Sequence, residues 1–288
     1  MTGTARDLGV SPSRLRGADV RHIFHGVVVP VNWGEDCLSL ARAYASKMHA
    51  THYFSHETAA ILHGMRLPRR VQLSSKLHVT TMGGGRPVRG KGIQGHVGAS
   101  ATALRGGLRL ATPLEAWCQL GSLLSIEELV IAGDGLVSRK NPSATMSEMQ
   151  SAVESRQGTR GCQNLRDALG YVRERTDSAR ETMLRLLIVR AGMPEPMINA
   201  PVRSRAGRVV AHADLAYPEF NLVLEYDGDQ HRTDRSQYYI DIDRLERITR
   251  EGWRVIRINL KHMANAATLA ATIREALVDA GCVLPAQK

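Results

Sequence analysis

The chain has few aromatic residues, few cysteines and no long apolar run, and each shortage argues against a class of protein. It contains 3 Phe, 7 Tyr and 3 Trp among 288 residues, and no aromatic-rich RNA-recognition motif is visible. The 4 cysteines lie far apart without a Cys-x-x-Cys pair, so they predict neither a zinc site nor a disulfide framework. No apolar run approaches the ~20 residues that a membrane helix needs, and no secretory signal opens the chain. We therefore expect a cytoplasmic protein without a membrane partner.

The chain does have an excess of basic residues, and the excess lies in its first part. The whole chain holds 38 Lys and Arg against 28 Asp and Glu, a formal net charge of +10. Residues 1–176 hold 22 basic against 13 acidic residues, whereas residues 177–288 hold 16 against 15. A basic part beside a part with many carboxylates is typical of a protein that holds a polyanion and reacts with it. The charge permits DNA as a partner without requiring it.

Three carboxylates are placed around one turn between residues 209 and 231. Two apolar strands meet at Tyr217–Asn221, because the proline of this turn cannot extend a strand ladder. Side chains alternate faces along a strand, so Glu225 and Asp227 share a face roughly 6–7 Å apart, and Asp214 can approach them across the turn. Converging carboxylates in an apolar setting repel one another and favour a hard cation, Mg²⁺ or Mn²⁺. The alternative is a surface hairpin with scattered acidic residues.

The order of residues around these carboxylates is similar to that of a known family. Glu225-x-Asp227-Gly is followed by Gln230 and His231, then by Asp-x-x-Arg244 on a predicted helix and Gly-Trp-x-Val-Ile-Arg. This set resembles the nuclease-like family related to very-short-patch-repair (Vsr-type) endonucleases, within the PD-(D/E)xK superfamily, over about residues 177–262. The resemblance implies a restriction-endonuclease-like α/β sandwich and Mg²⁺-dependent hydrolysis of phosphodiester bonds in DNA.

The resemblance also implies roles for individual residues. Asp214 and Glu225 would ligate the metal, with the backbone carbonyl of Tyr226 as a third ligand. The metal would polarise the phosphate and lower the pKa of an attacking water, and His231 could relay a proton. Glu181 has two interpretations of equal weight. An acidic residue at this place in the family often reaches the metal site, but Ser-x-x-Glu181 is also a capping box that explains the residue by itself.

The chain departs from the superfamily at position 227. Members commonly have a Lys there, which steers the water, whereas this chain has Asp227. Either Asp227 holds the water or a second metal, with Gln230 or Arg244 donating hydrogen bonds, or the site binds without cutting. The alternative function is therefore a non-catalytic DNA-binding regulator, antitoxin-like, that uses the nuclease fold as a scaffold. A nuclease acting on RNA is a third interpretation.

The first half carries a second, weaker resemblance. Ser55–Pro68, followed by His78-Val-Thr80, resembles the antitoxin-type proteins of abortive-infection systems, the AbiEi-like group, which implies an accessory domain that contacts DNA or a partner protein. Residues 5–29 suggest a shortened winged helix-turn-helix, with Arg14 and Arg16 available for phosphates. A domain-opening helix followed by an edge strand is the alternative for this segment.

The glycine-rich segment 83–92 follows a predicted strand at 77–81 and carries three cations. Arg86, Arg89 and Lys91 could track a phosphate backbone, although the segment lacks the spacing of a nucleotide-binding P-loop. A solvated hairpin loop is the alternative.

Eight histidines precede residue 100, which raises the question of a metal site. His52 and His56 alone have the i, i+4 spacing of neighbours on a helix face, but Ser55 between them has the character of a helix cap. The histidine spacing therefore does not predict a metal site.

Capping boxes and one polar segment suggest how the chain is divided. Thr112-x-x-Glu and Ser125-x-x-Glu predict that helices start at Pro113 and Ile126. The polar segment 138–145, which contains Asn-Pro, is the best candidate linker. We expect a basic accessory domain of mixed α+β structure at 1–145, a helical connector at 146–176 and the nuclease-fold domain at 177–288. A homodimer and an unknown partner protein are both left open.

Overall fold

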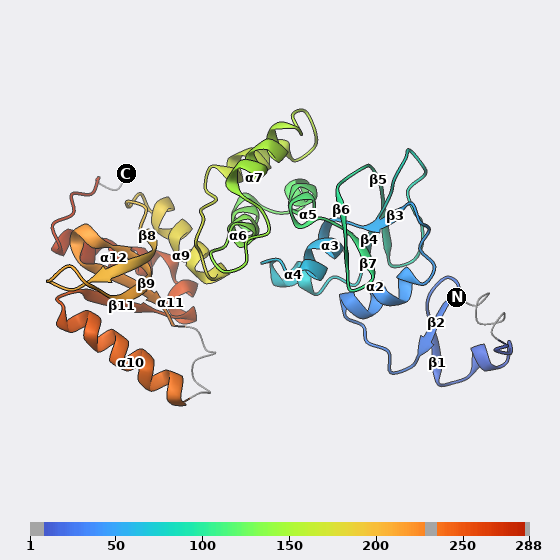
Figure 1. Ribbon diagram of the computed structural model, residues 1–288, viewed down its shortest axis with the longest axis horizontal. Coiled ribbons are helices and arrows are strands. Elements are labelled where there is room, and N and C mark those ends of the chain that lie inside the picture. The colour runs from blue at the N-terminus through green and yellow to red at the C-terminus, as the bar shows by residue number, and fades with distance from the viewer. Residues whose placement is uncertain (1–8, 228–234, 286–288) are drawn as a thin grey trace. The chain divides into compact units, whose positions relative to one another are not determined.

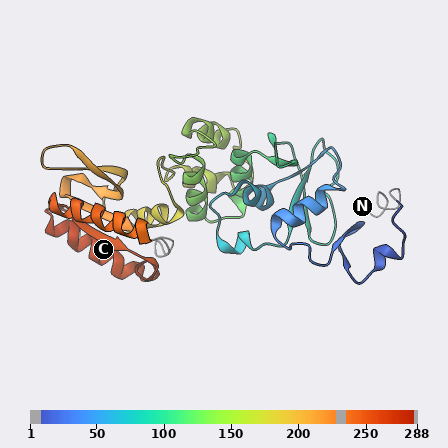
Figure 2. The ribbon, with the colours of Figure 1, turned by 60° about the horizontal axis from the view of Figure 1, so that its bottom comes forward.

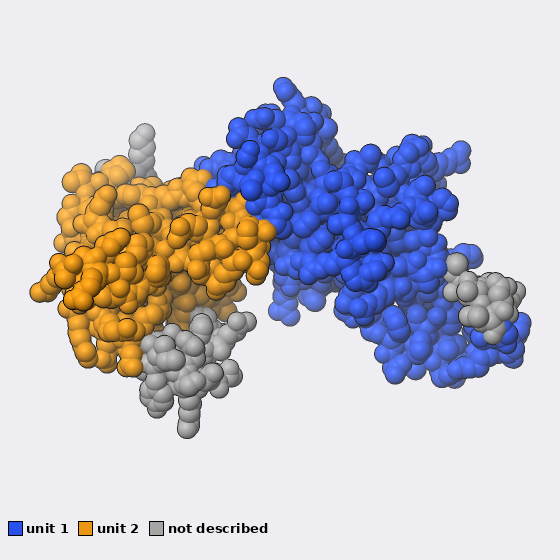
Figure 3. All heavy atoms as spheres, viewed as in Figure 1, with its two compact units in different colours: residues 1–136, 143–172 blue, residues 137–142, 173–288 orange. Residues whose placement is uncertain are grey.

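The computed structural model describes residues 9–227 and 235–285, and the chain forms two compact units (Figure 3). The N-terminal unit comprises Met1–Leu136 and Ser143–Val172, and the C-terminal unit comprises Val137–Pro142 and Arg173–Lys288. Two helices that the sequence assigned to a connector, α7 (Met146–Glu154) and α8 (Cys162–Leu169), belong to the N-terminal unit. Within the described residues, no helix combines the length and the apolar character that crossing a membrane requires.

A five-stranded mixed sheet lies in the N-terminal unit (Figure 1). Its strands occur in the order β5-β4-β3-β7-β6, where β3 pairs parallel with β7 and β4 pairs parallel with β5. The strands are β3 (His52–Phe54), β4 (Leu77–Thr81), β5 (Ile93–Val97), β6 (Thr102–Arg105) and β7 (Leu108–Ala111). The helices and the 3₁₀ turn around them are α2 (Cys37–Ala45), α3 (His56–His63), α4 (Arg69–Gln72), α5 (Pro113–Gln119), η2 (Leu120–Ser122) and α6 (Ile126–Leu136).

The helix boundaries of this unit follow local capping chemistry. α5 begins at Pro113, and the Thr112 side chain accepts a hydrogen bond from the backbone N–H of Glu115. α6 begins at Ile126 as predicted, because Ser125 and Glu128 exchange reciprocal side-chain and backbone bonds of 2.9 and 3.3 Å.

Two expectations for this unit are wrong. Residues 9–30 form a 3₁₀ turn η1 (Arg14–Arg16) and the antiparallel strands β1 (Val20–Phe24) and β2 (Val27–Pro30), so these residues contain no helix-turn-helix. η1 ends where the backbone becomes extended at Gly17. The glycine-rich segment is not a hairpin loop, because the strands it joins, β4 and β5, are parallel.

The C-terminal unit contains a four-stranded sheet in the order β11-β10-β9-β8. Its strands are β8 (Met197–Arg203), β9 (Val209–Tyr217), β10 (Leu222–Tyr226) and β11 (Arg254–Ile258). β8, β9 and β10 are antiparallel neighbours, and β11 pairs parallel with β10 after the crossover helix α10 (Arg235–Arg250). The turn between β9 and β10 lies where the sequence predicts it, as a 3₁₀ turn η3 (Pro218–Phe220) followed by Asn221 with a φ of 46°.

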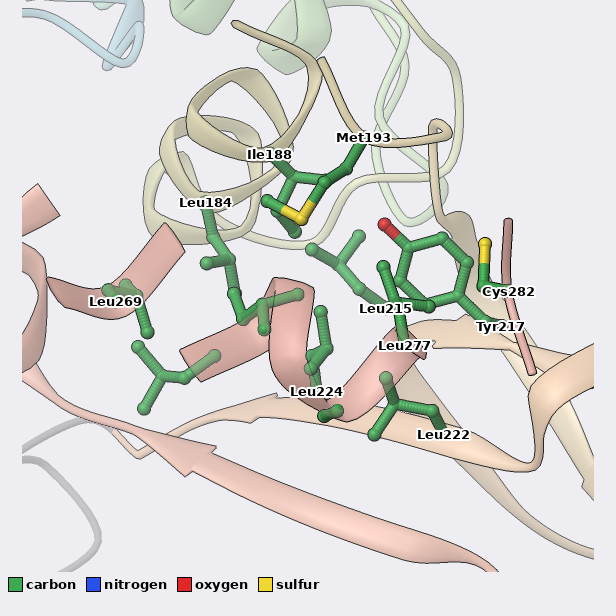
Figure 4. Packing of buried hydrophobic residues seen from close by; sticks show 13 residues of the cluster. Leu184, Ile188, Met193, Leu215, Tyr217, Leu222, Leu224, Leu269, Leu277 and Cys282 are labelled. Atoms are coloured by element: carbon green, nitrogen blue, oxygen red, sulfur yellow. The ribbon is translucent and has the colours of Figure 1, made fainter. Parts of the chain in front are cut away.

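Helices cover both faces of this sheet (Figure 1, Figure 2). On one face, α9 (Ala179–Arg190) and α12 (Ala266–Asp279) pack against alternate strand residues, including Leu222 and Leu224 (Figure 4). On the other face, Val223 packs with Ile248 of α10. α11 (Leu260–Ala264) completes the unit. The alternation that the sequence predicts for β10 thus places apolar side chains on both faces, as in an α/β protein with a covered sheet.

Candidate functional site

Asp214 and Glu225 lie on adjacent strands of the C-terminal sheet. β9 and β10 pair with Leu215 opposite Leu224, and continuing this register puts Asp214 opposite Glu225. The Asp214 carboxylate also accepts a hydrogen bond of 2.9 Å from the backbone N–H of Tyr226. Glu225 is buried, with 6% of its surface exposed, and Asp214 is partly buried. The sheet therefore brings together the two residues predicted to ligate a metal.

The surroundings of Asp214 disfavour its negative charge. Burial raises the pKa of the Asp214 carboxyl to about 7, and the charges of Glu225 and Glu181 add to this rise. The Tyr226 N–H and the charge of Arg244 lower the pKa by smaller amounts. A cation placed beside this carboxyl would favour its ionised form.

Glu225 has a cation of its own within the chain. Arg244, on α10, donates to both carboxylate oxygens of Glu225, at 3.0 and 2.8 Å. Its guanidinium also donates to the backbone carbonyl of His212 at 2.9 Å. This forked arrangement is the strong form of an Arg–carboxylate pair, and it neutralises a carboxylate that is otherwise removed from water.

Glu181 makes two hydrogen bonds at the start of α9. Its backbone N–H donates to the Ser178 hydroxyl at 3.2 Å, which caps α9, and its carboxylate accepts from the backbone N–H of Asp177 at 2.8 Å. The same carboxylate is near enough for its charge to raise the pKa of Asp214. Glu181 therefore stabilises the helix start and contributes to the electrostatics of the site.

Asp227 has other partners than Asp214 and Glu225 and is more exposed. It follows β10, its N–H donates to the Ile258 carbonyl at 2.7 Å, and its carboxylate accepts from Arg257 at 2.7 Å. Its side chain is 41% exposed, compared with 8% for that of Glu225. The other two predicted site residues, Gln230 and His231, lie outside the described residues.

The carboxylates of Asp214 and Glu225 fit Mg²⁺ better than a cation that takes all its ligands from the protein. Among the described residues, these acidic side chains do not form a group of three with ligand atoms within 4.8 Å of one another. Mg²⁺ keeps several waters and commonly takes one or two protein carboxylates. Asp214 and Glu225 supply two, and the carbonyl of Tyr226 follows directly in the strand.

The cations predicted to contact nucleic acid are on the surface of the N-terminal unit. Arg86, Arg89 and Lys91 are exposed in the segment between β4 and β5. Arg16 is exposed on η1, whereas the Arg14 guanidinium forms a forked pair with Asp19 at 2.7 and 2.6 Å.

One group that the sequence did not predict is a cluster of three histidines in the N-terminal unit. The ligand atoms of His56, His78 and His96 all lie within 4.8 Å of one another. Spacing along the chain gave no sign of it, because the cluster depends on which strands pair.

Comparison with known proteins gives distant relatives. Two uncharacterized proteins of Mycobacterium tuberculosis, Rv2248 and MT2308, are each 26% identical to this chain over 173 residues. The match covers 60% of this chain and 62% of each relative, so the chain spans less than two thirds of their length. No family model and no solved structure matches.

Proposed function

We propose that the C-terminal unit is a metal-dependent endonuclease of the restriction-endonuclease-like class that hydrolyses phosphodiester bonds in DNA. The observation that carries the proposal is the placement of Asp214 beside the buried Glu225 on adjacent strands, where burial and neighbouring carboxylates raise the pKa of Asp214. A carboxyl perturbed by burial and by specific charged neighbours is typical of a functional site. The resemblance to Vsr-type endonucleases implies that Asp214 and Glu225 share a site, and their positions on adjacent strands agree with this.

In this proposal Asp214 and Glu225 hold Mg²⁺ or Mn²⁺, with the Tyr226 carbonyl as a further ligand. The bound ion would polarise the scissile phosphate and increase the acidity of the attacking water. Glu225 can ligate an ion if Arg244 gives up part of its forked pair, and the released N–H groups of Arg244 are then available to a phosphate oxygen. His231 and Gln230 keep their proposed roles as proton relay and hydrogen-bond donor.

Cleavage of DNA by the purified full chain is expected with Mg²⁺ or Mn²⁺ and not with EDTA. Asp214→Asn and Glu225→Gln should each lower the rate at least ~100-fold, because metal stabilisation of a transition state is worth several kcal/mol. The matched control is Asp279→Asn, which makes the same chemical change at a surface pair with Arg254. If the variants cleave DNA as fast as the wild type, the activity lies elsewhere in the chain or belongs to a contaminating protein.

The same assay examines the departure at position 227. If Asp227 acts with the metal, Asp227→Asn should lose cleavage while DNA binding survives. Loss of folding is not expected, because the Asp227–Arg257 pair is largely exposed.

A non-catalytic DNA-binding regulator is the second candidate function. It is favoured by the two ion pairs that neutralise the acidic residues without a metal, Arg244 with Glu225 and Arg257 with Asp227. DNA binding without cleavage of any DNA form would support this function over the nuclease.

Both candidate functions require DNA binding, and we propose that Arg86, Arg89 and Lys91, which are exposed on the N-terminal unit, contribute to it. Changing all three to Ala in the full chain should flatten the dependence of duplex-DNA affinity on salt. Each lost phosphate contact reduces the slope of log K against log salt by about 0.9, so three contacts give a reduction of up to ~2.7. Arg250→Ala, which removes an exposed cation paired with Glu246, is the control. An unchanged slope in a mobility-shift titration would remove this segment from the DNA-binding surface.

A further inference from the structure

The histidine cluster is formed by three elements that are separate in sequence (Figure 1). His56 opens α3 directly after β3, His78 lies in β4, and His96 lies in β5. β4 and β5 are parallel, with His78 opposite Gln94 and His96 opposite Thr80. Since side chains alternate along each strand and paired residues share a face, His78 and His96 are diagonal neighbours on one face.

The imidazole nitrogens are already near the separation that a metal imposes. Nδ1 of His78 and Nε2 of His96 are 3.0 Å apart, and the His56 and His96 rings stack with their centroids 3.7 Å apart. Two nitrogens bound to one tetrahedral zinc ion at 2.0–2.1 Å are about 3.3 Å apart. All three ligand atoms lie within 4.8 Å of one another, and the stacked rings of His56 and His96 would have to rotate for both to bind one ion.

The other ring nitrogens face groups that can orient the imidazoles. Nε2 of His78 is 3.4 Å from the Glu57 carboxylate, which leaves Nδ1 directed at the cluster. Nδ1 of His56 is 2.9 Å from the Ser55 hydroxyl, which leaves its Nε2 for a ligand. A histidine that binds a metal through one nitrogen usually donates its other N–H to a carboxylate or another oxygen, which fixes the tautomer.

The three imidazoles are partly or fully removed from water. His78 is buried, with 7% of its surface exposed, and His56 and His96 are half-buried. A neutral imidazole is the form that binds a metal. Nδ1 of His78 and Nε2 of His96 share a hydrogen bond, so metal binding would require the ring that donates it to change its tautomer.

The backbone at His56 is held in an unusual conformation. Its φ is +47°, in the left-handed region that a residue with a Cβ rarely adopts. Its N–H donates to the Gln119 side chain of α5 at 2.7 Å, and the Ser55 hydroxyl beside it accepts from Thr80 at 2.7 Å. Strained residues that the surrounding contacts hold in place often occur at functional sites.

From this geometry we infer that His56, His78 and His96 form a binding site for a divalent transition-metal ion of the Zn²⁺ class. Three imidazoles suit Zn²⁺ and Co²⁺, whereas the carboxylates of the C-terminal unit suit Mg²⁺ and Mn²⁺. Glu57 would support the site from behind His78, and three protein ligands leave a fourth coordination position for water. This site lies in a different unit from the proposed nuclease site and does not depend on it.

The site can be tested with Co²⁺, which replaces Zn²⁺ and absorbs visible light when nitrogen ligands surround it. The visible absorption of the EDTA-treated full chain should saturate as Co²⁺ is added, and added Zn²⁺ should abolish it. His96→Gln should weaken Co²⁺ binding at least ~10-fold, and Glu57→Gln by about 10–100-fold, because removal of an orienting partner has that effect. Thermal melting of the metal-free variants, followed by circular dichroism, checks that they fold. If His96→Gln does not fold, His56→Gln replaces it in the Co²⁺ titration.

Two controls separate this site from other histidines and from the acidic site. His22→Gln removes an exposed histidine on β1, and Asp214→Asn removes a carboxylate of the C-terminal unit; both should leave the Co²⁺ spectrum unchanged. No saturable Co²⁺ absorption in the wild-type chain would overturn the inference. The inference would also be overturned if the His56→Gln and His96→Gln variants fold and keep the Co²⁺ spectrum. Loss of the spectrum in Asp214→Asn would overturn it as well.

Discussion

Replacing Asp214 with Asn is expected to stabilise the metal-free C-terminal unit by about 1–3 kcal/mol at pH 8, and by about 1 kcal/mol or less at pH 5. The pKa of this carboxyl is about 7 in the folded chain, against ~3.9 for an Asp in an unfolded one. Between these values the folded state keeps a proton that the unfolded state has lost, so stability falls as the pH rises from about 4 to 7 and then levels off. A tenfold difference in acidity between the two states corresponds to about 1.4 kcal/mol, and the partial exposure of Asp214 reduces the total.

Asn can still accept the Tyr226 N–H, so the substitution removes the charge without removing that hydrogen bond. The chain would be equilibrated in urea at each pH and then labelled by a hydrogen-exchange pulse at one fixed pH. Labelling of the peptide that contains β10 reports the unfolded fraction of the C-terminal unit, and hence the free energy of unfolding of this unit alone. Asp279→Asn is the matched control and should change the free energy of unfolding by less than about 0.5 kcal/mol. A loss of stability in Asp214→Asn at pH 8, or an equal effect at both pH values, would contradict the assignment of the raised pKa.

Arg244→Met should have a larger effect in the opposite direction. It leaves the Glu225 carboxylate buried without its forked partner, and breaking a buried pair in this way costs about 3–5 kcal/mol. Adding Glu225→Gln to Arg244→Met should recover most of the lost stability, since the uncompensated charge is then gone. The same pulsed exchange of β10 measures both variants.

A matched arginine on the same helix provides the control for Arg244. Arg250 pairs with Glu246 at 2.8 Å, but both side chains are mostly exposed, so Arg250→Met should cost less than about 1 kcal/mol. If Arg244→Met were no more destabilising than Arg250→Met, the Arg244–Glu225 pair would not hold the acidic residues in place.

The features predicted correctly from the sequence are those that local chemistry determines. The turn between β9 and β10 follows from Pro218, which cannot extend a ladder, and from Asn221, which tolerates a positive φ. The starts of α5 and α6 follow from side chains that bond within three residues of each helix start. These signals do not depend on how the rest of the chain folds.

The features that the sequence missed depend on tertiary pairing. The histidine cluster requires β4 and β5 to be parallel neighbours, which spacing along the chain cannot reveal. The forked contact between Arg244 and Glu225 joins a helix to a strand, so its role as counter-ion was not foreseen even though both residues were site candidates. The expected helix-turn-helix failed for a local reason, because the backbone becomes extended at Gly17 and η1 ends after three residues.

A calorimetric titration of the full chain with Mn²⁺ tests whether Asp214 and Glu225 hold a divalent cation. It is best done in the His96→Gln background, so that the histidine cluster does not contribute heat. We predict saturable Mn²⁺ binding that Mg²⁺ competes away and that Asp214→Asn abolishes, because Asp214 and Glu225 together hold the ion. Equal Mn²⁺ binding with and without Asp214→Asn, or no binding in either protein, would contradict it.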